Sequence, residues 1–259
     1  MQVTIIGSGN VATVMGRILV EKGYTINKVF SRQLKHAEEL AAELNAEPVT
    51  DLAMIDTSAD IYLLAITDDA LQEIASTLFV KNKLVIHTAG SVSKEILKNA
   101  STNYGVLWPM KMIRKSMSTL MPVTIVVDGN TEPVTRQLQQ LATEFSPVVT
   151  IANDEARVKM HMLAAITSNF TNHLYQLAAE YCAAENIDFS FFYPMIEETA
   201  QRIQSQHPKE LQAGPAFRGD RQTMEKHLVL LKQYPQAKKL YQALSESIRV
   251  SFPDNGRSF

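Results

Sequence analysis

Val3-Thr4-Ile5-Ile6-Gly7-Ser8-Gly9-Asn10-Val11-Ala12 is the stretch of this 259-residue chain that decides the fold we expect. A β-branched apolar run leads into the pattern G-x-G-x-x-A, and a helical pattern follows over residues 10–22. Gly7 permits a tight turn, Gly9 lets the backbone approach a pyrophosphate, and Ala12 lets the helix pack closely on the strand. This context predicts that Gly7, Ser8, Gly9, Asn10 and Val11 hold dinucleotide phosphates at the helix N-terminus. The alternative is a glycine turn that binds nothing.

The alternation of strand and helix continues over the first 150 residues. Further strand patterns cover 25–30, 61–66, 84–87, 123–127 and 148–151, and helical patterns cover 33–44 and 70–78, the latter with Asp68 or Asp69 as its cap. Strands separated by helices need crossover connections, which predicts a mostly parallel, doubly wound sheet covered on both faces. We therefore expect an α/β domain over residues 1–152.

The pattern changes to helix alone after Ile151. Asn153 is a suitable N-cap, and helical patterns cover 154–185, 189–206, 221–232 and 236–250. Because no glycine- or serine-rich linker separates the two halves, we expect an all-α second domain over residues 153–259 that packs firmly on the first.

The end of the second strand bears on the cofactor. NAD sites place an acid about 20 residues after the glycine turn, where it holds the ribose 2′-hydroxyl. This chain instead has Ser31 and Arg32 there, with Lys35 close behind. A guanidinium and a hydroxyl suit a 2′-phosphate, which favours NADP. The alternative is that Arg32 simply begins a solvated helix.

Composition narrows the class of protein. The 25 basic and 27 acidic residues give a net charge of −2, which argues against general binding of nucleic acid or anionic membranes. No uncharged apolar run reaches the length of a membrane span, and there is no secretory leader pattern. A single cysteine, Cys182, fits a reducing compartment and a place in the core. We expect a cytoplasmic protein.

Several motifs resemble a known family. The opening turn, Ser31-Arg32, Ala65-Ile66-Thr67-Asp68-Asp69 and His87-Thr88-Ala89-Gly90 resemble the NADP oxidoreductase-like relatives of pyrroline-5-carboxylate reductase. Ser168-Asn169, the run Gly214-Pro215-Ala216-Phe217-Arg218-Gly219-Asp220, Thr223 and His227 resemble the DUF2520-type helical domain. The resemblance implies an NADP-binding Rossmann domain and a homodimer through a helical domain like the C-terminal domain of 6-phosphogluconate dehydrogenase.

Polar residues gather where strands of the predicted sheet end. Thr67, Asp68, His87, Thr88 and Gly90 lie at such ends, where open α/β sheets bind ligands. The resemblance implies that Ile66 and Thr67 flank the adenosine and that the Thr88–Ser91 segment flanks the nicotinamide. Many relatives carry a His- or Tyr-Pro and a Gln after the sixth strand. Here Trp108-Pro109-Met110-Lys111 stands there, so the chain departs from the family's pattern at a position of a shared substrate contact.

The long helix after Asn153 carries the first catalytic candidates. His161, Ala165, Ser168, Asn169 and Asn172 share one face of an α-helix at this spacing. Hydride transfer to a C=O or C=N group needs a proton donor, which His161 would supply while Asn169 orients the substrate. The alternative is a hydrogen-bond network between helices or a dimer contact.

The segment Gly214–His227 carries the second set. Asp220 is positioned to cap the next helix with His227 on the same side, and Arg218 is suited to hold a carboxylate or phosphate. A cluster of caps and salt bridges is the alternative. No metal-ligand spacing is present in the sequence, so we expect no metal site.

These observations predict an NADP-dependent oxidoreductase acting on a small carbonyl or imine substrate. One alternative is a non-catalytic NADP-binding sensor or scaffold. The other is a ketopantoate- or pyrroline-carboxylate-type reductase.

Overall fold

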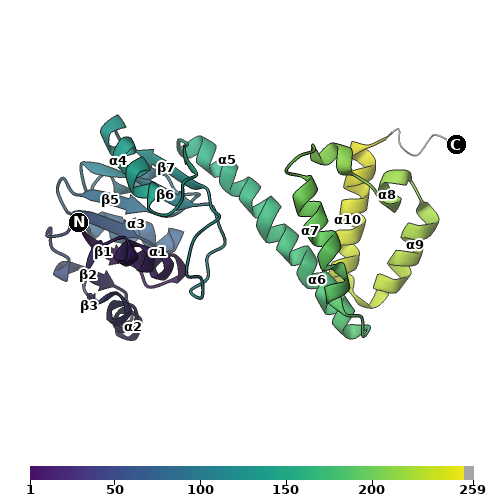
Figure 1. The fold of residues 1–259 in the computed structure, drawn as a ribbon, viewed down its shortest axis with the longest axis horizontal. Coiled ribbons are helices and arrows are strands. Elements are labelled where there is room, and N and C mark those ends of the chain that lie inside the picture. The colour runs from purple at the N-terminus through teal and green to yellow at the C-terminus, as the bar shows by residue number, and fades with distance from the viewer. Residues whose placement is uncertain (254–259) are drawn as a thin grey trace. The chain divides into compact units, whose positions relative to one another are not determined.

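A computed structural model describes residues 1–253 and divides the chain into two compact units, Met1–Ser168 and Asn169–Phe259 (Figure 1). The last six residues of the expected second domain, 254–259, lie outside the described part. The expected division after residue 152 stays a prediction. The sheet ends at Ile151, and the helix that follows it groups with the sheet.

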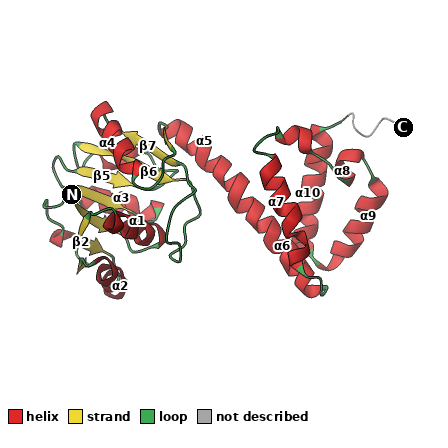
Figure 2. Ribbon diagram, in the orientation of Figure 1, coloured by secondary structure: helices red, strands yellow, loops and turns green. Residues whose placement is uncertain are grey.

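The first unit is built on one eight-stranded sheet (Figure 2). Its strands are β1 Gln2–Ile6, β2 Thr25–Phe30, β3 Glu47–Val49, β4 Ile61–Leu64, β5 Leu84–His87, β6 Asn103–Pro109, β7 Ile125–Gly129 and β8 Val149–Ile151. Their order is β3-β2-β1-β4-β5-β6-β7-β8, and every pair is parallel except β6 with β7. The mostly parallel Rossmann sheet predicted from the sequence is therefore confirmed.

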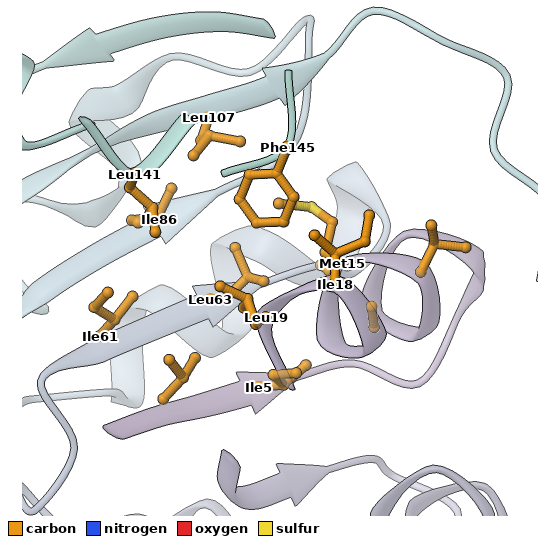
Figure 3. Packing of buried hydrophobic residues seen from close by; sticks show 14 of the residues in the cluster. Ile5, Met15, Ile18, Leu19, Ile61, Leu63, Ile86, Leu107, Leu141 and Phe145 are labelled. Atoms are coloured by element: carbon orange, nitrogen blue, oxygen red, sulfur yellow. The ribbon is translucent and has the colours of Figure 1, made fainter. Parts of the chain in front are cut away.

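Helices cover both faces of this sheet. They are α1 Asn10–Glu21, α2 Leu34–Leu44, α3 Asp68–Thr77 and α4 Glu132–Thr143, with short 3-10 turns at Leu52–Met54 and Lys94–Leu97. A fifth helix, α5 Asp154–Ala164, follows β8 and contacts the sheet through Met160 and Ala164. One core lies under α1, α2 and α4, where Ile5, Leu63 and Ile86 meet Met15 and Leu19 (Figure 3). The alternate strand residues pack with α3 in a second core. A sheet buried on both faces explains its continuous apolar strands.

Three elements of this unit carry too little local pattern to be predicted. β3 is a three-residue edge strand containing Pro48, β6 contains Gly105 and Pro109, and α4 begins at a Thr-Glu-Pro sequence. The strand predicted over 61–66 ends at Leu64. The predicted cap of α3 was wrong, because Thr67 takes the N-cap position without a side-chain bond and both aspartates lie inside the first turn.

The second unit is helical. It comprises α6 Thr171–Ala184, α7 Tyr193–Arg202, α8 Pro215–Arg218, α9 Arg221–Leu230 and α10 Pro235–Ser251, with 3-10 turns at Phe189–Phe192, Pro208–Leu211 and Leu231–Gln233. A π-helical turn, Ala165–Phe170, joins α5 to α6. The predicted caps are present: Asn153 accepts from the Ala156 N–H at 3.0 Å, and Asp220 accepts from the Thr223 N–H at 3.0 Å. None of the helices within residues 1–253 has the length and apolar character needed to cross a bilayer.

The helical unit has almost no core of its own. Among its described residues only Cys182 and Ala216 are buried, so the expected place of Cys182 is confirmed. Large apolar side chains lie exposed instead, among them Leu230, Val229 and Met195. Exposed apolar surface of this kind is typical of a site that contacts another molecule.

His87 is a titratable residue buried completely in the sheet unit. Its Nδ1 accepts a hydrogen bond from the Ala89 N–H at 3.2 Å. Burial, followed by the positive charge of Arg157, lowers the pKa of His87 from 6.5 to about 4. The imidazole is therefore neutral at pH 7.

Replacing His87 should flatten the acid dependence of stability. The unfolded chain takes up a proton on this side chain near pH 6.5, whereas the folded protein takes it up only near pH 4. Stability therefore falls as pH falls through this window, by up to about 3 kcal/mol from this group. Urea unfolding of His87→Asn across the window should show a shallower loss than the wild type. The exposed His207→Asn is the matched control, and parallel profiles for His87→Asn and the wild type would contradict the assignment.

Candidate active site

The glycine turn after β1 is shaped by two different requirements. Gly7 has φ +124°, its N–H donates to the Phe30 carbonyl at 2.8 Å, and a Cβ there would lie 2.2 Å from the Ala65 oxygen. Only glycine is tolerated at this position. A Cβ on Gly9 would meet nothing within 4 Å, so protein packing does not demand glycine there. The open space beside Gly9 fits a ligand approaching the α1 N-terminus.

Close packing of α1 holds this turn in place. Ala12 is fully buried, and a Cβ on Gly16 would lie 2.6 Å from Leu44 Cδ1 and 3.0 Å from Ile5 Cδ1. Gly16 lies outside the G-x-G-x-x-A pattern and was not predicted to matter. The signal was a second small residue one helical turn beyond Ala12, on the same side of α1.

A cavity of about 490 Å³ opens at this turn. Of the residues predicted to bind the cofactor, it is lined by Gly7, Ser8, Gly9, Asn10, Val11, Ser31, Arg32, Ile66, Thr67 and Thr88. Residues missed by the sequence analysis also line it, namely Phe30, Gln33, His36, Ala65, Ala70, Glu73, Ile74 and Ile113. Segments from four strand ends therefore meet at one cavity, as expected at the carboxyl edge of a parallel sheet.

The end of β2 forms one side of this cavity. The Ser8 hydroxyl donates to the Ser31 hydroxyl at 3.0 Å, which ties the glycine turn to β2. Arg32 and His36 both line the cavity, whereas Lys35 is 82% exposed and lies 4.0 Å from Glu39. His36 therefore takes the place beside Arg32 that the sequence suggested for Lys35. Its signal was its position four residues after Arg32, at the start of α2.

Two predicted cofactor residues do not line the cavity. Asp68 accepts a hydrogen bond from the Ser91 hydroxyl at 2.5 Å, linking α3 to the segment after β5. Gly90 lies against α5, where a Cβ would come within 2.6 Å of both His161 Cδ2 and Trp108 Cε2. His87 is likewise absent from the lining.

His161 is exposed and lies beside the indole ring of Trp108. Its ring centroid is 5.6 Å from that of Trp108, with the ring planes at 50°. Met160 and Ala164 of α5 pack on the small core around Trp108, so the sheet holds this part of the helix.

The expected polar face of the long helix is interrupted. The prediction of this face assumed α-helical spacing from His161 to Asn172. The π turn Ala165–Phe170 instead has i→i+5 hydrogen bonds, which change the angle between successive side chains around the helix axis. His161 and Asn169 therefore do not keep the relation predicted for an α-helix. Lys159 pairs with Glu155 on the surface of α5.

The other catalytic candidates lie in the helical unit. Asp220 caps α9, and hydrogen bonds from the Thr223 hydroxyl at 2.7 Å and the Thr223 N–H hold the pKa of Asp220 below its usual value. His227 Nδ1 lies 2.9 Å from the Tyr241 hydroxyl. Arg218 ends α8. Asp220 thus matches the capping alternative. Among residues 1–253 no group of three or more His, Cys, Asp or Glu side chains is arranged to hold a metal.

The helical unit also contains an apolar recess of about 430 Å³. It is lined by Leu174, Leu177, Ala178, Tyr181, Cys182, Phe192, His227, Leu230, Leu231, Ala237, Leu240, Tyr241 and Leu244. These residues come from α6, α9, α10 and the turns between helices, so the recess is a feature of this unit alone.

Comparison with known proteins agrees with this architecture. Residues 2–91 match the family described as "NADP oxidoreductase coenzyme F420-dependent", and residues 123–248 match the domain of unknown function DUF2520. A curated glycerol-3-phosphate dehydrogenase [NAD(P)+] from Staphylococcus saprophyticus is 30% identical over 115 residues, which are 39% of this chain. The match spans only 35% of that dehydrogenase.

Solved structures extend the likeness to the whole chain. A proposed NADP oxidoreductase from Bacteroides fragilis has 34% identity and a TM-score of 0.88, covering 95% of this chain and 97% of its own. An imine reductase from Myxococcus stipitatus in complex with NADP+ (12% identity, TM-score 0.73, coverage 99% and 96%) has the same fold. So does a 1-pyrroline-5-carboxylate reductase from Streptococcus pyogenes (14%, 0.69, coverage 96% and 98%). The chain therefore belongs to the NAD(P)-dependent oxidoreductase family in which an NADP oxidoreductase domain is followed by a DUF2520 domain.

Proposed function

We propose that the protein transfers hydride between NADP(H) and a small carbonyl or imine substrate. The observation that carries this proposal is the cavity at the glycine turn, with open space beside Gly9 and a guanidinium at the end of β2. Bound there, the cofactor would place its pyrophosphate on Gly7–Val11. Ile66 and Thr67 would flank its adenosine, and the segment after β5, with Thr88 and Gly90, would flank its nicotinamide.

The charges at the end of β2 favour NADP over NAD. The lining contributed there by Phe30, Ser31, Arg32, Gln33 and His36 contains no carboxylate, the group that would hold a ribose 2′-hydroxyl and repel a 2′-phosphate. Arg32 can bind the phosphate with two parallel hydrogen bonds. Glu73 also lines the cavity, but it comes from α3 rather than from the β2 end.

His161 is the group we propose as proton donor. A bound NADPH would supply hydride to the substrate carbon, and a side chain of this protein would then have to give a proton to the oxygen or nitrogen of the C=O or C=N bond. His161 is exposed and touches the segment expected beside the nicotinamide, whereas His87 is buried and neutral at pH 7. Asn169, Arg218 and His227 remain candidate substrate contacts from the helical unit. Imine reduction is favoured by the likeness to imine and pyrroline-5-carboxylate reductases.

We further propose a cytoplasmic homodimer formed through the helical unit. A unit whose described part buries only Cys182 and Ala216 exposes more apolar surface than a soluble monomer ordinarily shows. The apolar recess and the exposed Leu230 offer a surface on which a second copy would bury side chains. Obligate dimer interfaces are apolar in this way.

Arg32→Ala should separate the two nicotinamide cofactors. Loss of a charge-assisted contact to the 2′-phosphate should weaken NADPH binding about 10- to 100-fold and leave NADH binding within about twofold. Calorimetric titration measures both. Lys35→Ala, which removes an exposed lysine beside Glu39, should change neither affinity. Equal losses for the two cofactors in Arg32→Ala would refute the 2′-phosphate contact.

A substrate panel tests the reaction itself. NADPH oxidation is followed with cyclic imines, imino acids and 2-oxo acids, including ketopantoate and pyrroline-5-carboxylate. We expect substrate-dependent turnover that falls about 10²- to 10⁴-fold in His161→Ala, with NADPH affinity nearly unchanged. His207→Ala is the control. Tight NADPH binding with no turnover across the panel would favour the sensor, and undiminished turnover in His161→Ala would refute the proton-donor role.

The dimer is tested by light scattering on the eluting protein. The wild type should have twice the mass of the 28.9 kDa chain, and Leu230→Glu should shift it towards monomer because a charge would be buried. Val20→Glu, an exposed apolar position on α1, is the control that should remain dimeric. A wild type that stays monomeric at high concentration contradicts the assembly.

A further inference from the structure

Arg157, near the start of α5, is the largest completely buried side chain among the described residues. A guanidinium is costly to bury unless its charge is paired and its N–H groups are used. Nε and Nη1 of Arg157 make no hydrogen bond within the described residues. An apolar side chain of similar volume would serve packing at least as well. The bonds that Arg157 does make are therefore informative.

The two hydrogen bonds of Nη2 and the ion pair of Nη1 join three parts of the sheet unit. Nη2 donates to the Val92 carbonyl at 2.5 Å and to Asp154 at 2.6 Å, and Nη1 lies 3.5 Å from Asp128 Oδ2. Val92 lies in the segment after β5, Asp128 lies on β7, and Asp154 begins α5. The guanidinium thus links that segment and β7 to the helix.

The neighbouring residues reinforce the same link. Lys94 Nζ lies 2.7 Å from Asp128 Oδ2, and the Lys94 N–H donates to Asp154 at 3.2 Å. The Ser93 hydroxyl also donates to Asp154. Burial alone would raise the pKa of Asp154, but the hydrogen bonds from Ser93 and Arg157 outweigh it and lower that pKa. Residues 92–94 are therefore held against α5 by an ionised carboxylate and a guanidinium.

His161 makes a second contact between α5 and the segment that follows β5, at Gly90. It lies four residues after Arg157, on the same side of the helix. Its ring packs where a Cβ of Gly90 would be, beside Trp108. Gly90 and residues 92–94 thus contact α5 one helical turn apart, at His161 and at Arg157.

We propose that Arg157 is a positioning residue, which holds residues 88–94 against α5 and so sets where His161 lies relative to the nicotinamide. The proposal rests on the function proposed above, in which that segment flanks the nicotinamide and His161 donates the proton. Arg157 itself, being wholly buried, acts through these two elements.

The test separates positioning from stability with a double variant. Arg157→Met with Asp128→Asn removes one charge of each sign, so the net charge of the cluster is unchanged, and the amide oxygen introduced at position 128 can still accept the hydrogen bond of Lys94 Nζ. We expect its unfolding midpoint to stay near that of the wild type, because replacing a buried ion pair is often neutral for stability. NADPH affinity should stay within about threefold, since the phosphate contacts lie on other segments. We expect kcat to fall about tenfold or more through misplacement of the donor.

Two further variants complete the set. Arg157→Lys keeps the charge and can keep one of the bonds, so it should recover part of the kcat lost in the double variant. Arg136→Met removes an exposed arginine that pairs with Glu132 and should match the wild type throughout. The emission of Trp108, the single tryptophan of the chain, should change in the Arg157 variants because it contacts His161 and Gly90.

Trp108 emission also keeps the proposal independent of turnover. If no substrate in the panel is reduced, the proposed reaction fails, yet altered emission in folded Arg157→Lys would still support the placement by Arg157. Emission and kcat equal to wild type in the folded double variant would overturn the proposal. If the double variant does not fold, unchanged emission in Arg157→Lys would overturn it equally.

Discussion

The contact between Gly7 and Ala65 is the constraint on which the nucleotide-binding half depends. No side chain fits between the turn after β1 and the carbonyl that follows β4, so the chain passes there as bare backbone. That contact, together with the packing of Gly16 on Ile5 and Leu44, fixes where α1 begins. The N–H groups of α1 then face the open space beside Gly9, and segments from neighbouring strand ends close the cavity around it.

Charge is distributed around this framework in two ways. At the end of β2, the guanidinium of Arg32 borders the cavity, with His36 beside it in the lining. A second set of charges comes from the segment after β5, from β7 and from α5, where Lys94, Asp128 and Asp154 surround the buried guanidinium of Arg157. The first arrangement suits recognition of an anion. The second suits holding backbone segments in place, because a buried charge keeps its partners at defined distances.

The helical half poses a different physical problem. Its helices carry many apolar side chains, but among the described residues only Cys182 and Ala216 are buried within the unit. The same unit has an apolar recess, and the exposed Leu230 is one of the residues that line it. Hydrophobic content that the sequence pattern suggests as a domain core is therefore largely exposed surface in the described part of this unit.

Local features of the fold were determined by the sequence alone. The glycine turn, the strands with two buried faces, and the caps at Asn153 and Asp220 depend on residues close together in the chain, so their patterns are readable. Tertiary structure decided the rest, since the partners lie far apart in sequence. Edge strand β3 needs β2 beside it, Asp68 bonds Ser91 instead of capping α3, and the π turn shifts the polar face of the long helix. In the sequence, Arg157 cannot be told from an ordinary charged residue on a helix. In the folded protein, Asp128 and Val92 from distant segments contact its guanidinium.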